Sequence, residues 1–343
     1  MSLVSELAES PAVVERLVRD ARAPLRELAG RVEQRGIDAV FLAARGTSDH
    51  AATYAQYVLG IRNGLATGLA VPSVQSVYGS HPDVSRALVI GISQSGRSPD
   101  VVEVLADARK QGAVTLAITN EPASPLAEAA ETVVALEAGP ELAVAASKTY
   151  IAELAVVALL SDALAGGGSE PELEALPGHV ARALETEHDA QHAARELRGL
   201  RQCAVIGRGY HYATIREWAL KLKEMGLIMA DPYSAADFEH GPIALVEPGY
   251  QVLAVAVSGP TLAGLAELLP RLRADGARLL VISDDASVRE AADDAIPLEA
   301  GVPEWLSPAV AIVPCQLFAY HLALANGRDP DSPRRLQKVT LTR

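Results

Sequence analysis

The sequence predicts an α/β protein made of two tandem, doubly wound domains, each with its own parallel sheet. Three observations lead to this. Short runs rich in Val, Ile and Leu alternate with helical patterns, the runs are apolar at successive positions, and the whole pattern occurs twice. A strand that is apolar on both sides needs cover on both faces, as parallel strands between helical layers have. A chain of 343 residues is long enough for two such domains.

The internal repeat rests on three pairs of matching segments, each separated by 162 to 164 residues. The pairs are "AARGT" (43–47) with "IGRGY" (206–210), "KQGAVTLAIT" (110–119) with "ADGARLLVIS" (274–283), and "LEAG" (136–139) with "LEAG" (298–301). A nearly constant offset over three separate stretches indicates a tandem duplication.

Eight apolar runs are the expected strands, four in each copy. They are 39–43, 87–92, 114–119 and 132–136, then 203–207, 252–257, 279–283 and 295–298. The linker-like "AGGGSEPE" falls between the copies. The expected organisation is a helical lead-in (1–35), a first domain (36–165), a linker and helix (166–200), a second domain (201–326) and a tail (327–343).

The composition excludes several classes of function. The formal net charge is −13, which disfavours nucleic acid and anionic membranes as partners. Cys203 and Cys315 lie in apolar runs without metal-ligand spacing, so we expect core residues and no metal site. The start "MSLVSELAES" has no basic region typical of a secretory signal, and the apolar stretch "TYIAELAVVALLSDALA" is interrupted by Glu153 and Asp162. We therefore expect a cytoplasmic protein.

Two corners of the first copy have the chemistry of a phosphate site. "RGTSDH" (45–50) and "SQSGRS" (93–98) each follow an expected strand and precede a helix. Small residues there let backbone N–H groups and a helix N-terminus face an anion. The alternative is that these serines only cap helices. The corresponding corners of the second copy, "RGYHYA" (208–213) and "VAVSGPT" (255–261), have lost most of the hydroxyls, which favours one phosphate site per chain.

The second copy carries a different set of candidate residues. Lys221 and Glu224 are three residues apart in "EWALKLKEMG", so they share one face of a helix. His240 lies in "EHGP", before a glycine and a proline, which places it on a loop. An exposed ion pair on an amphipathic helix would also account for Lys221 and Glu224.

With "GTS", "SQSG", "ALKLKE", "EHGP" and the tail "DPDSPRRLQKVTLT" in this order, the chain resembles the tandem sugar isomerase (SIS) domains of glucosamine-6-phosphate synthase. The resemblance covers nearly the whole chain and implies two flavodoxin-like domains. It implies that the first-copy corners bind the phosphate of a sugar phosphate and that a segment after the last strand of the first domain lines the substrate. The residues concerned are Gly46, Thr47, Ser48, Ser93, Gln94, Ser95 and Ser98 for the phosphate, and Val144 and Ala145 for the lining.

The resemblance also implies four catalytic roles. Glu224 would move a proton between C1 and C2 of the sugar, and Lys221 would assist it. His240 would open the sugar ring from the neighbouring subunit, which implies a homodimer with shared active sites. Lys338 in the tail would reach the sugar carbonyl. No metal or organic cofactor is implied.

The sequence also departs from the synthases. Their "SQSGE" is "SQSGR" here, which puts Arg97 beside the phosphate corner, and their tail "AKSVTVE" is replaced by "QKVTLTR" around Lys338. The sequence begins at the sugar-binding half, and neither cysteine lies near its start, so we expect no glutaminase activity.

Stand-alone relatives commonly release ammonia from aminosugar phosphates. We therefore expect a deaminase that converts glucosamine 6-phosphate to fructose 6-phosphate and ammonia. The open alternatives are a sugar-phosphate isomerase, a deglycase and a synthase subunit without its glutaminase. A non-catalytic phosphosugar sensor is an alternative of another class, although a sensor has no need for Glu224, His240 and Lys338 together.

Overall fold

The computed structural model describes residues 2–338, so residues 339–343 of the expected tail lie outside the described residues. The chain divides into two compact units. The first-sheet unit comprises residues 9–141, 148–177 and 337–338. The second-sheet unit comprises residues 2–8, 142–147 and 178–336. Three short segments thus cross between the halves of the sequence: residues 2–8 and 142–147 group with the second-sheet unit, and residues 337–338 group with the first-sheet unit.

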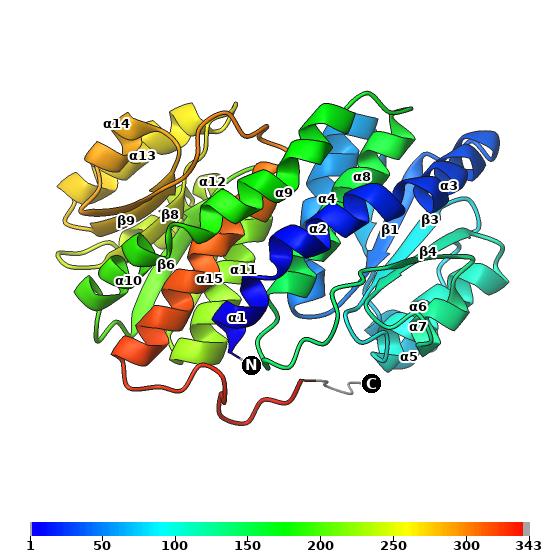
Figure 1. The fold of residues 1–343 in the computed structure, drawn as a ribbon, viewed down its shortest axis with the longest axis horizontal. Helices are drawn as coiled ribbons and strands as arrows, with labels where there is room; N and C mark the ends of the chain where they lie inside the picture. The colour runs from blue at the N-terminus through cyan, green and yellow to red at the C-terminus, as the bar shows by residue number, and fades with distance from the viewer. Residues whose placement is uncertain (1, 339–343) are drawn as a thin grey trace. The chain divides into compact units, whose positions relative to one another are not determined.

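The first-sheet unit contains a five-stranded parallel sheet in the order β2-β1-β3-β4-β5 (Figure 1). The strands are β1 (Ala39–Ala43), β2 (Ala66–Leu69), β3 (Leu88–Ile92), β4 (Val114–Thr119) and β5 (Thr132–Ala135). The chain leaves β1 in one direction along the sheet and continues from β3 in the other. The gap between β1 and β3 is therefore the switch point, beyond which ligands bind in doubly wound folds.

Helices cover both faces of this sheet. They are α2 (Ser10–Asp20), α3 (Arg22–Gln34), α4 (Thr47–Asn63), α5 (Ser73–Ser76), α6 (Pro99–Lys110), α7 (Pro125–Ala129) and α8 (Lys148–Leu164), with the start of α9 (Glu170–Leu184). On one face, Val101 and Leu105 of α6 and Leu126 of α7 pack against Val89 and Ala117 of the sheet. The other face is covered by α4, and α8 packs against α4. This sandwiching explains why the strands are apolar throughout.

The second-sheet unit repeats the topology, with the strand order β10-β9-β8-β6-β7. Its strands are β6 (Gln202–Gly207), β7 (Met229–Ser234), β8 (Gln251–Val255), β9 (Arg278–Ser283) and β10 (Asp294–Pro297). Its helices are α1 (Leu3–Leu7), α10 (Glu187–Glu196), α11 (His211–Gly226), α12 (Ala235–Glu239), the 3₁₀ turn η1 (Pro242–Leu245), α13 (Leu262–Ala274), α14 (Ala286–Glu290), α15 (Ser307–Ala325) and the end of α9. The fold class predicted from the sequence is confirmed.

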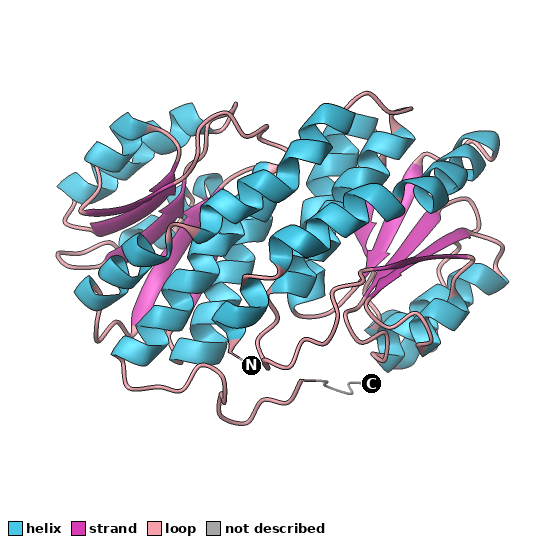
Figure 2. Cartoon of the chain, viewed as in Figure 1, coloured by secondary structure: helices cyan, strands magenta, loops and turns pink. Residues whose placement is uncertain are grey.

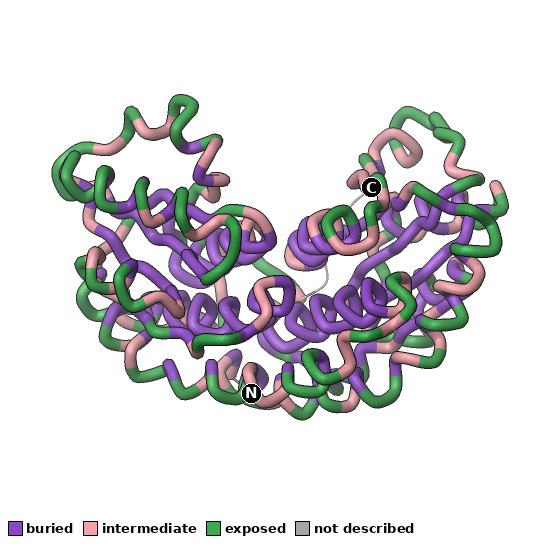
Figure 3. The backbone as a smooth tube through the Cα atoms, turned by 90° about the horizontal axis from the view of Figure 1, so that it is seen from above, coloured by how far each residue is buried: buried purple, intermediate pink, exposed green. Residues whose placement is uncertain are grey.

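Helices also cover both faces of this sheet (Figure 2). Phe238 of α12 and Leu269 of α13 pack on one face, against Ile206 of β6. Helices α10, α11 and α15 cover the other face, where Trp218 and Phe318 meet edge to face at 5.7 Å. In each unit the inner strands are largely buried, whereas the covering helices expose their outward sides (Figure 3).

Among residues 2–338, α15 is the one helix long and apolar enough to cross a membrane. The apolar stretch of this helix is 78% buried inside the protein, which is typical of a core helix.

Candidate active site

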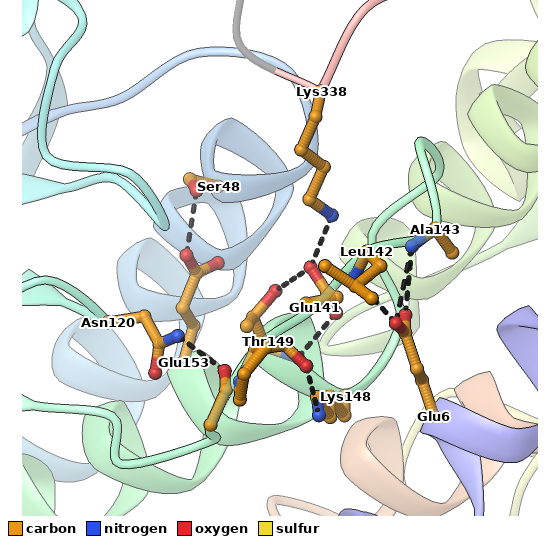
Figure 4. A network of polar contacts seen from close by, with 12 residues as sticks. Glu6, Ser48, Asn120, Glu141, Leu142, Ala143, Lys148, Thr149, Glu153 and Lys338 are labelled. Atoms are coloured by element: carbon orange, nitrogen blue, oxygen red, sulfur yellow. Dashed lines mark hydrogen bonds and ion pairs between the residues drawn. The ribbon is translucent and has the colours of Figure 1, made fainter. Parts of the chain in front are cut away.

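The first corner joins β1 to α4. Gly46 turns the chain with φ +56° and ψ −129°, a conformation that glycine adopts far more readily than other residues. Thr47 is then the first residue of α4, so the unpaired N–H groups of that helix face the end of the sheet. Ser48 is buried, and its Oγ donates a 2.7 Å hydrogen bond to Oε1 of Glu153 on α8 (Figure 4). The corner therefore offers helix N–H groups, while its Ser48 hydroxyl already binds a buried carboxylate.

The second corner joins β3 to α6 and is a tight turn held by its own serines. The Oγ of Ser93 accepts the N–H of Gly96 at 3.2 Å, and the Oγ of Ser95 accepts the N–H of Arg97 at 3.3 Å. Ser93 is buried, and Gln94 and Ser95 are half-buried. The corner is thus a compact loop with hydroxyl groups on successive small residues.

Gly96 is required at this corner for two reasons. Its φ is +62°, in the left-handed region. A Cβ at this position would also lie 2.0 Å from Oγ of Ser124 and 3.0 Å from Oγ1 of Thr119. The loop is therefore packed directly against the neighbouring turn, and no side chain fits there.

Ser98 and Pro99 complete the corner. Pro99 opens α6, and Ser98 occupies the N-cap position, but its side chain makes no capping hydrogen bond. Capping therefore does not explain Ser98. Arg45 of the first corner donates a 2.7 Å bond to the buried carboxylate of Asp100, which joins the two corners across the switch point. Arg45 remains 50% exposed, and Arg97 is exposed, so both corners carry positive charge.

Chemically, the two corners suit an anion. They combine two helix N-termini, small residues that permit close backbone approach, hydroxyl groups and two exposed guanidinium groups. The structure brings together the predicted phosphate residues of both corners, because β1 and β3 are neighbours in the sheet.

In the second-sheet unit, helix α11 carries a buried charged triad. The Nζ of Lys221 lies 2.6 Å from Oε2 of Glu224 and 3.2 Å from Oε1 of Glu217, one turn earlier. Lys221 and Glu217 are fully buried, whereas the side chain of Glu224 is 22% exposed. The alternative of an exposed ion pair on an amphipathic helix therefore does not apply, because Lys221 lies on the buried side of α11. Of the two carboxylates, only Glu224 reaches solvent, and it is the one that can meet a substrate.

The charge state of Lys221 follows from its two partners. Burial alone lowers the pKa of this ammonium, but the charges of Glu217 and Glu224 outweigh it and hold the pKa of Lys221 above its usual range. Lys221 is thus a permanent cation at physiological pH.

His240 lies at the end of α12, before Gly241 and the turn η1. It is exposed, and within residues 2–338 its ring makes no hydrogen bond or ion pair. The predicted loop position therefore agrees with the structure, and the imidazole is available to a ligand. Its role in ring opening stays a prediction.

Lys338 lies in the first-sheet unit, where its Nζ is 2.7 Å from Oε2 of Glu141 (Figure 4). Glu141 is buried, and its carboxylate also accepts hydrogen bonds from the backbone N–H of Thr149 at 3.1 Å and from the Oγ1 hydroxyl of Thr149 at 2.8 Å. The ammonium of Lys338 is thus held by an anchored carboxylate.

Val144 and Ala145 lie in the segment 142–147, which groups with the second-sheet unit. Ala145 is buried and Val144 is half-buried. Buried Glu6 holds the start of this segment, because its carboxylate accepts the N–H groups of Leu142 and Ala143 (Figure 4).

Three carboxylates that contact candidate site residues were not identified from the sequence: Glu217, Glu141 and Glu153. Glu217 had a signal, because a glutamate four residues before a lysine on one helix face forms a favourable pair. The others contact residues 105 and 197 positions away in the chain, so no local pattern reveals them. Within residues 2–338, no group of three or more His, Cys, Asp or Glu is placed to hold a metal ion.

The chain matches the SIS domain twice, over residues 35–162 and 196–326. It is 36% identical over 339 residues to the glutamine–fructose-6-phosphate aminotransferase (isomerizing) of Methanothermobacter thermautotrophicus, covering 98% of this chain and 56% of the relative. The corresponding enzyme of Thermococcus kodakarensis is 34% identical over 353 residues, with 98% and 57% coverage. The chain thus spans about half the length of the curated relatives that it matches.

Two solved structures have the same fold. The C-terminal domain of glucosamine-fructose-6-phosphate aminotransferase from Francisella tularensis superposes with a TM-score of 0.87 at 26% identity, covering 96% of this chain and 98% of the other. The glucosamine-6-phosphate deaminase of Thermotoga maritima superposes with a TM-score of 0.80, covering 99% and 100%, and at 23% identity this likeness shows the fold alone. The chain therefore belongs to the SIS-domain family, with two SIS domains in tandem that are homologous to the isomerase half of the aminotransferases.

Proposed function

We propose that the protein is an aminosugar-phosphate deaminase that converts glucosamine 6-phosphate to fructose 6-phosphate and ammonia. The observation that carries the proposal is the triad on α11, in which a buried lysine fixes one solvent-reaching carboxylate, Glu224. Such a carboxylate is suited to moving a proton between adjacent carbons. The phosphate-type corners of the first-sheet unit support a phosphorylated substrate.

In the proposed reaction, Glu224 removes the proton from C2 of the open-chain aminosugar, and the electron pair forms a C1–C2 double bond as the aldehyde oxygen gains a proton. Glu224 then returns the proton to C1, which leaves an imine at C2. Water adds to C2 and ammonia departs, giving the ketose. Each step is a proton transfer or a hydration, so the chemistry calls for no metal or organic cofactor.

Four other residue groups have supporting roles in this proposal. Lys221 holds the carboxylate of Glu224 at 2.6 Å and presents positive charge where the sugar oxygen becomes negative. His240 would open the sugar ring, and Lys338 would meet the carbonyl. The serine corners would hold the phosphate, whose binding energy positions C1 and C2.

The direct test is ammonia release from glucosamine 6-phosphate, with fructose 6-phosphate followed in parallel. Glu224→Gln removes the base but keeps the shape, and we expect turnover to fall by about 10²–10⁴-fold. Glu239→Gln is the matched control, because Glu239 is an exposed glutamate in a surface pair with Arg271. Turnover that survived within about tenfold in Glu224→Gln would refute the proton-shuttle role.

The outcome of the assay separates the alternatives. Interconversion of aldose and ketose phosphates without ammonia release would indicate an isomerase, and net synthesis from fructose 6-phosphate and ammonia a synthase subunit. Tight phosphosugar binding with no turnover of any kind would indicate a sensor. The homodimer with shared active sites and the cytoplasmic location remain predictions.

A further inference from the structure

A cavity of about 290 Å³ lies in the second-sheet unit, beside the start of β6 and the ends of α11 and α15. Three arginines line it: Arg198, Arg201 and Arg328. The N–H of Gly199 donates a hydrogen bond to Oδ1 of Asn326 at 2.7 Å, which joins two sides of the cavity. The cavity is distinct from the phosphate-type corners, which belong to the first-sheet unit.

Among residues 2–338, the three guanidinium groups have no carboxylate partner. Within residues 2–338, the side chains of Arg198, Arg201 and Arg328 make no ion pair and no hydrogen bond, although the chain has 43 acidic residues. Other arginines of the same unit do pair, for example Arg273 with Asp293 at 2.8 Å. A concentration of unneutralised positive charge in a chain of net charge −13 is therefore a local feature of this cavity.

Helix ends account for only part of this arrangement. Helices α10, α11 and α15 all end beside the cavity, and cations stabilise the negative ends of helices. That interaction helps to keep the arginines together, but it leaves their N–H groups unused. Each guanidinium presents five donors in a planar fork, which matches the oxygens of a phosphate group.

We propose that this cavity binds a small phosphate-bearing anion, at a site additional to the substrate's phosphate site. Its volume accommodates a phosphate group with a small ester. The loop before β6 contributes Arg198 and Arg201 to the cavity, and the segment after α15 contributes Arg328.

The site is connected to the proposed catalytic carboxylate. A neighbouring cavity of about 220 Å³ is lined by Glu224 and shares Leu227, Gly327 and Arg328 with the arginine cavity. An anion bound to the arginines therefore contacts the end of the helix that carries Glu224. The bound anion regulates turnover through that helix end.

Equilibrium dialysis with radiolabelled inorganic phosphate tests the site by counting the phosphates bound per chain. Two double variants are compared with the wild type: R198A/R201A for the cavity and S95A/S98A for the phosphate corner. We expect two phosphates per wild-type chain, and in each variant an affinity at least tenfold lower at the altered site alone. Far-ultraviolet circular dichroism, which reports on the helices of both units, confirms that each variant is folded.

Two results would overturn the proposal: unchanged phosphate binding in R198A/R201A, or equal binding by R198K/R201K and the wild type, which would indicate general attraction to charge. A single wild-type phosphate lost only in R198A/R201A would support this site and count against phosphate binding at the corner between β3 and α6. Regulation has its own readout, measured at saturating sugar phosphate so that the substrate site is occupied. There, added phosphate should change wild-type turnover and leave that of R198A/R201A unaltered, and the same response in both would refute the coupling.

Discussion

Glu217 gives the sharpest test of how the charged triad of α11 is stabilised. Glu217→Gln keeps the shape of the side chain and removes its charge, which leaves Lys221 fully buried with one carboxylate instead of two. At 3.2 Å and an effective dielectric constant of about 20, the attraction between Glu217 and Lys221 is about 5 kcal/mol. Burying the carboxylate offsets part of this, so we expect the variant to lose about 3 kcal/mol of unfolding free energy. The pKa of Lys221 should also fall, because burial then meets less opposing charge.

The protein supplies its own reporter for this experiment. Both tryptophans, Trp218 and Trp305, are buried in the second-sheet unit, so urea unfolding followed by their fluorescence reports on the unit that contains the triad. Glu239→Gln is the control, since its surface pair with Arg271 is worth less than about 1 kcal/mol. If Glu217→Gln lost no more stability than Glu239→Gln, the triad would contribute nothing through charge, and the reasoning would be wrong.

Two further predictions concern single positions in the two units. Gly96→Ala should lose at least about 1 kcal/mol more unfolding free energy than Gly112→Ala and should abolish phosphate binding at the corner. Both glycines have positive φ, but only a Cβ at Gly96 would collide with Ser124. Equal losses of unfolding free energy in the two variants, measured by chemical unfolding, would contradict this. Burial lowers the pKa of His211 to about 3, so between pH 7 and pH 5 the imidazole is neutral in the folded chain. In the unfolded chain it becomes protonated below about pH 6.5, which favours unfolding. Stability should therefore fall by about 2 kcal/mol between pH 7 and pH 5 on its account, and this part of the pH dependence should vanish in His211→Gln but persist in the exposed control His192→Gln.

Most of the fold was predictable because central parallel strands are apolar on both faces. All eight predicted runs are strands, and they include the three inner strands of each sheet. The two strands that were missed, β2 and β7, are edge strands with partly exposed sequences, "ATGL" and "MADPYS". Pro232 in β7 breaks the usual strand composition, and an edge position is where a sheet tolerates it.

The candidate site was predictable where chemistry is local in sequence. The serine corners and the Lys221–Glu224 pair could be found because their members lie within one turn or one helix. The carboxylates that hold Ser48 and Lys338 are Glu153 and Glu141, at positions that only the folded chain brings close. Long-range partners of this kind depend on how helices pack, which no periodicity in the sequence specifies.

The comparison of the two copies gives a physical reason why we expect the substrate's phosphate to bind in the first copy and not in the second. Gly259 of the second copy corresponds to Gly96 of the first, but the space above it is filled differently. A Cβ at Gly96 would meet the hydroxyl of Ser124, whereas a Cβ at Gly259 would lie 2.4 Å from Cδ of Glu304. Partial burial raises the pKa of Glu304, and within residues 2–338 no salt bridge to this carboxylate offsets that burial. A phosphate at the corner after β8 would face that carboxylate and be repelled, which supports the prediction that the substrate's phosphate binds at the corners of the first copy.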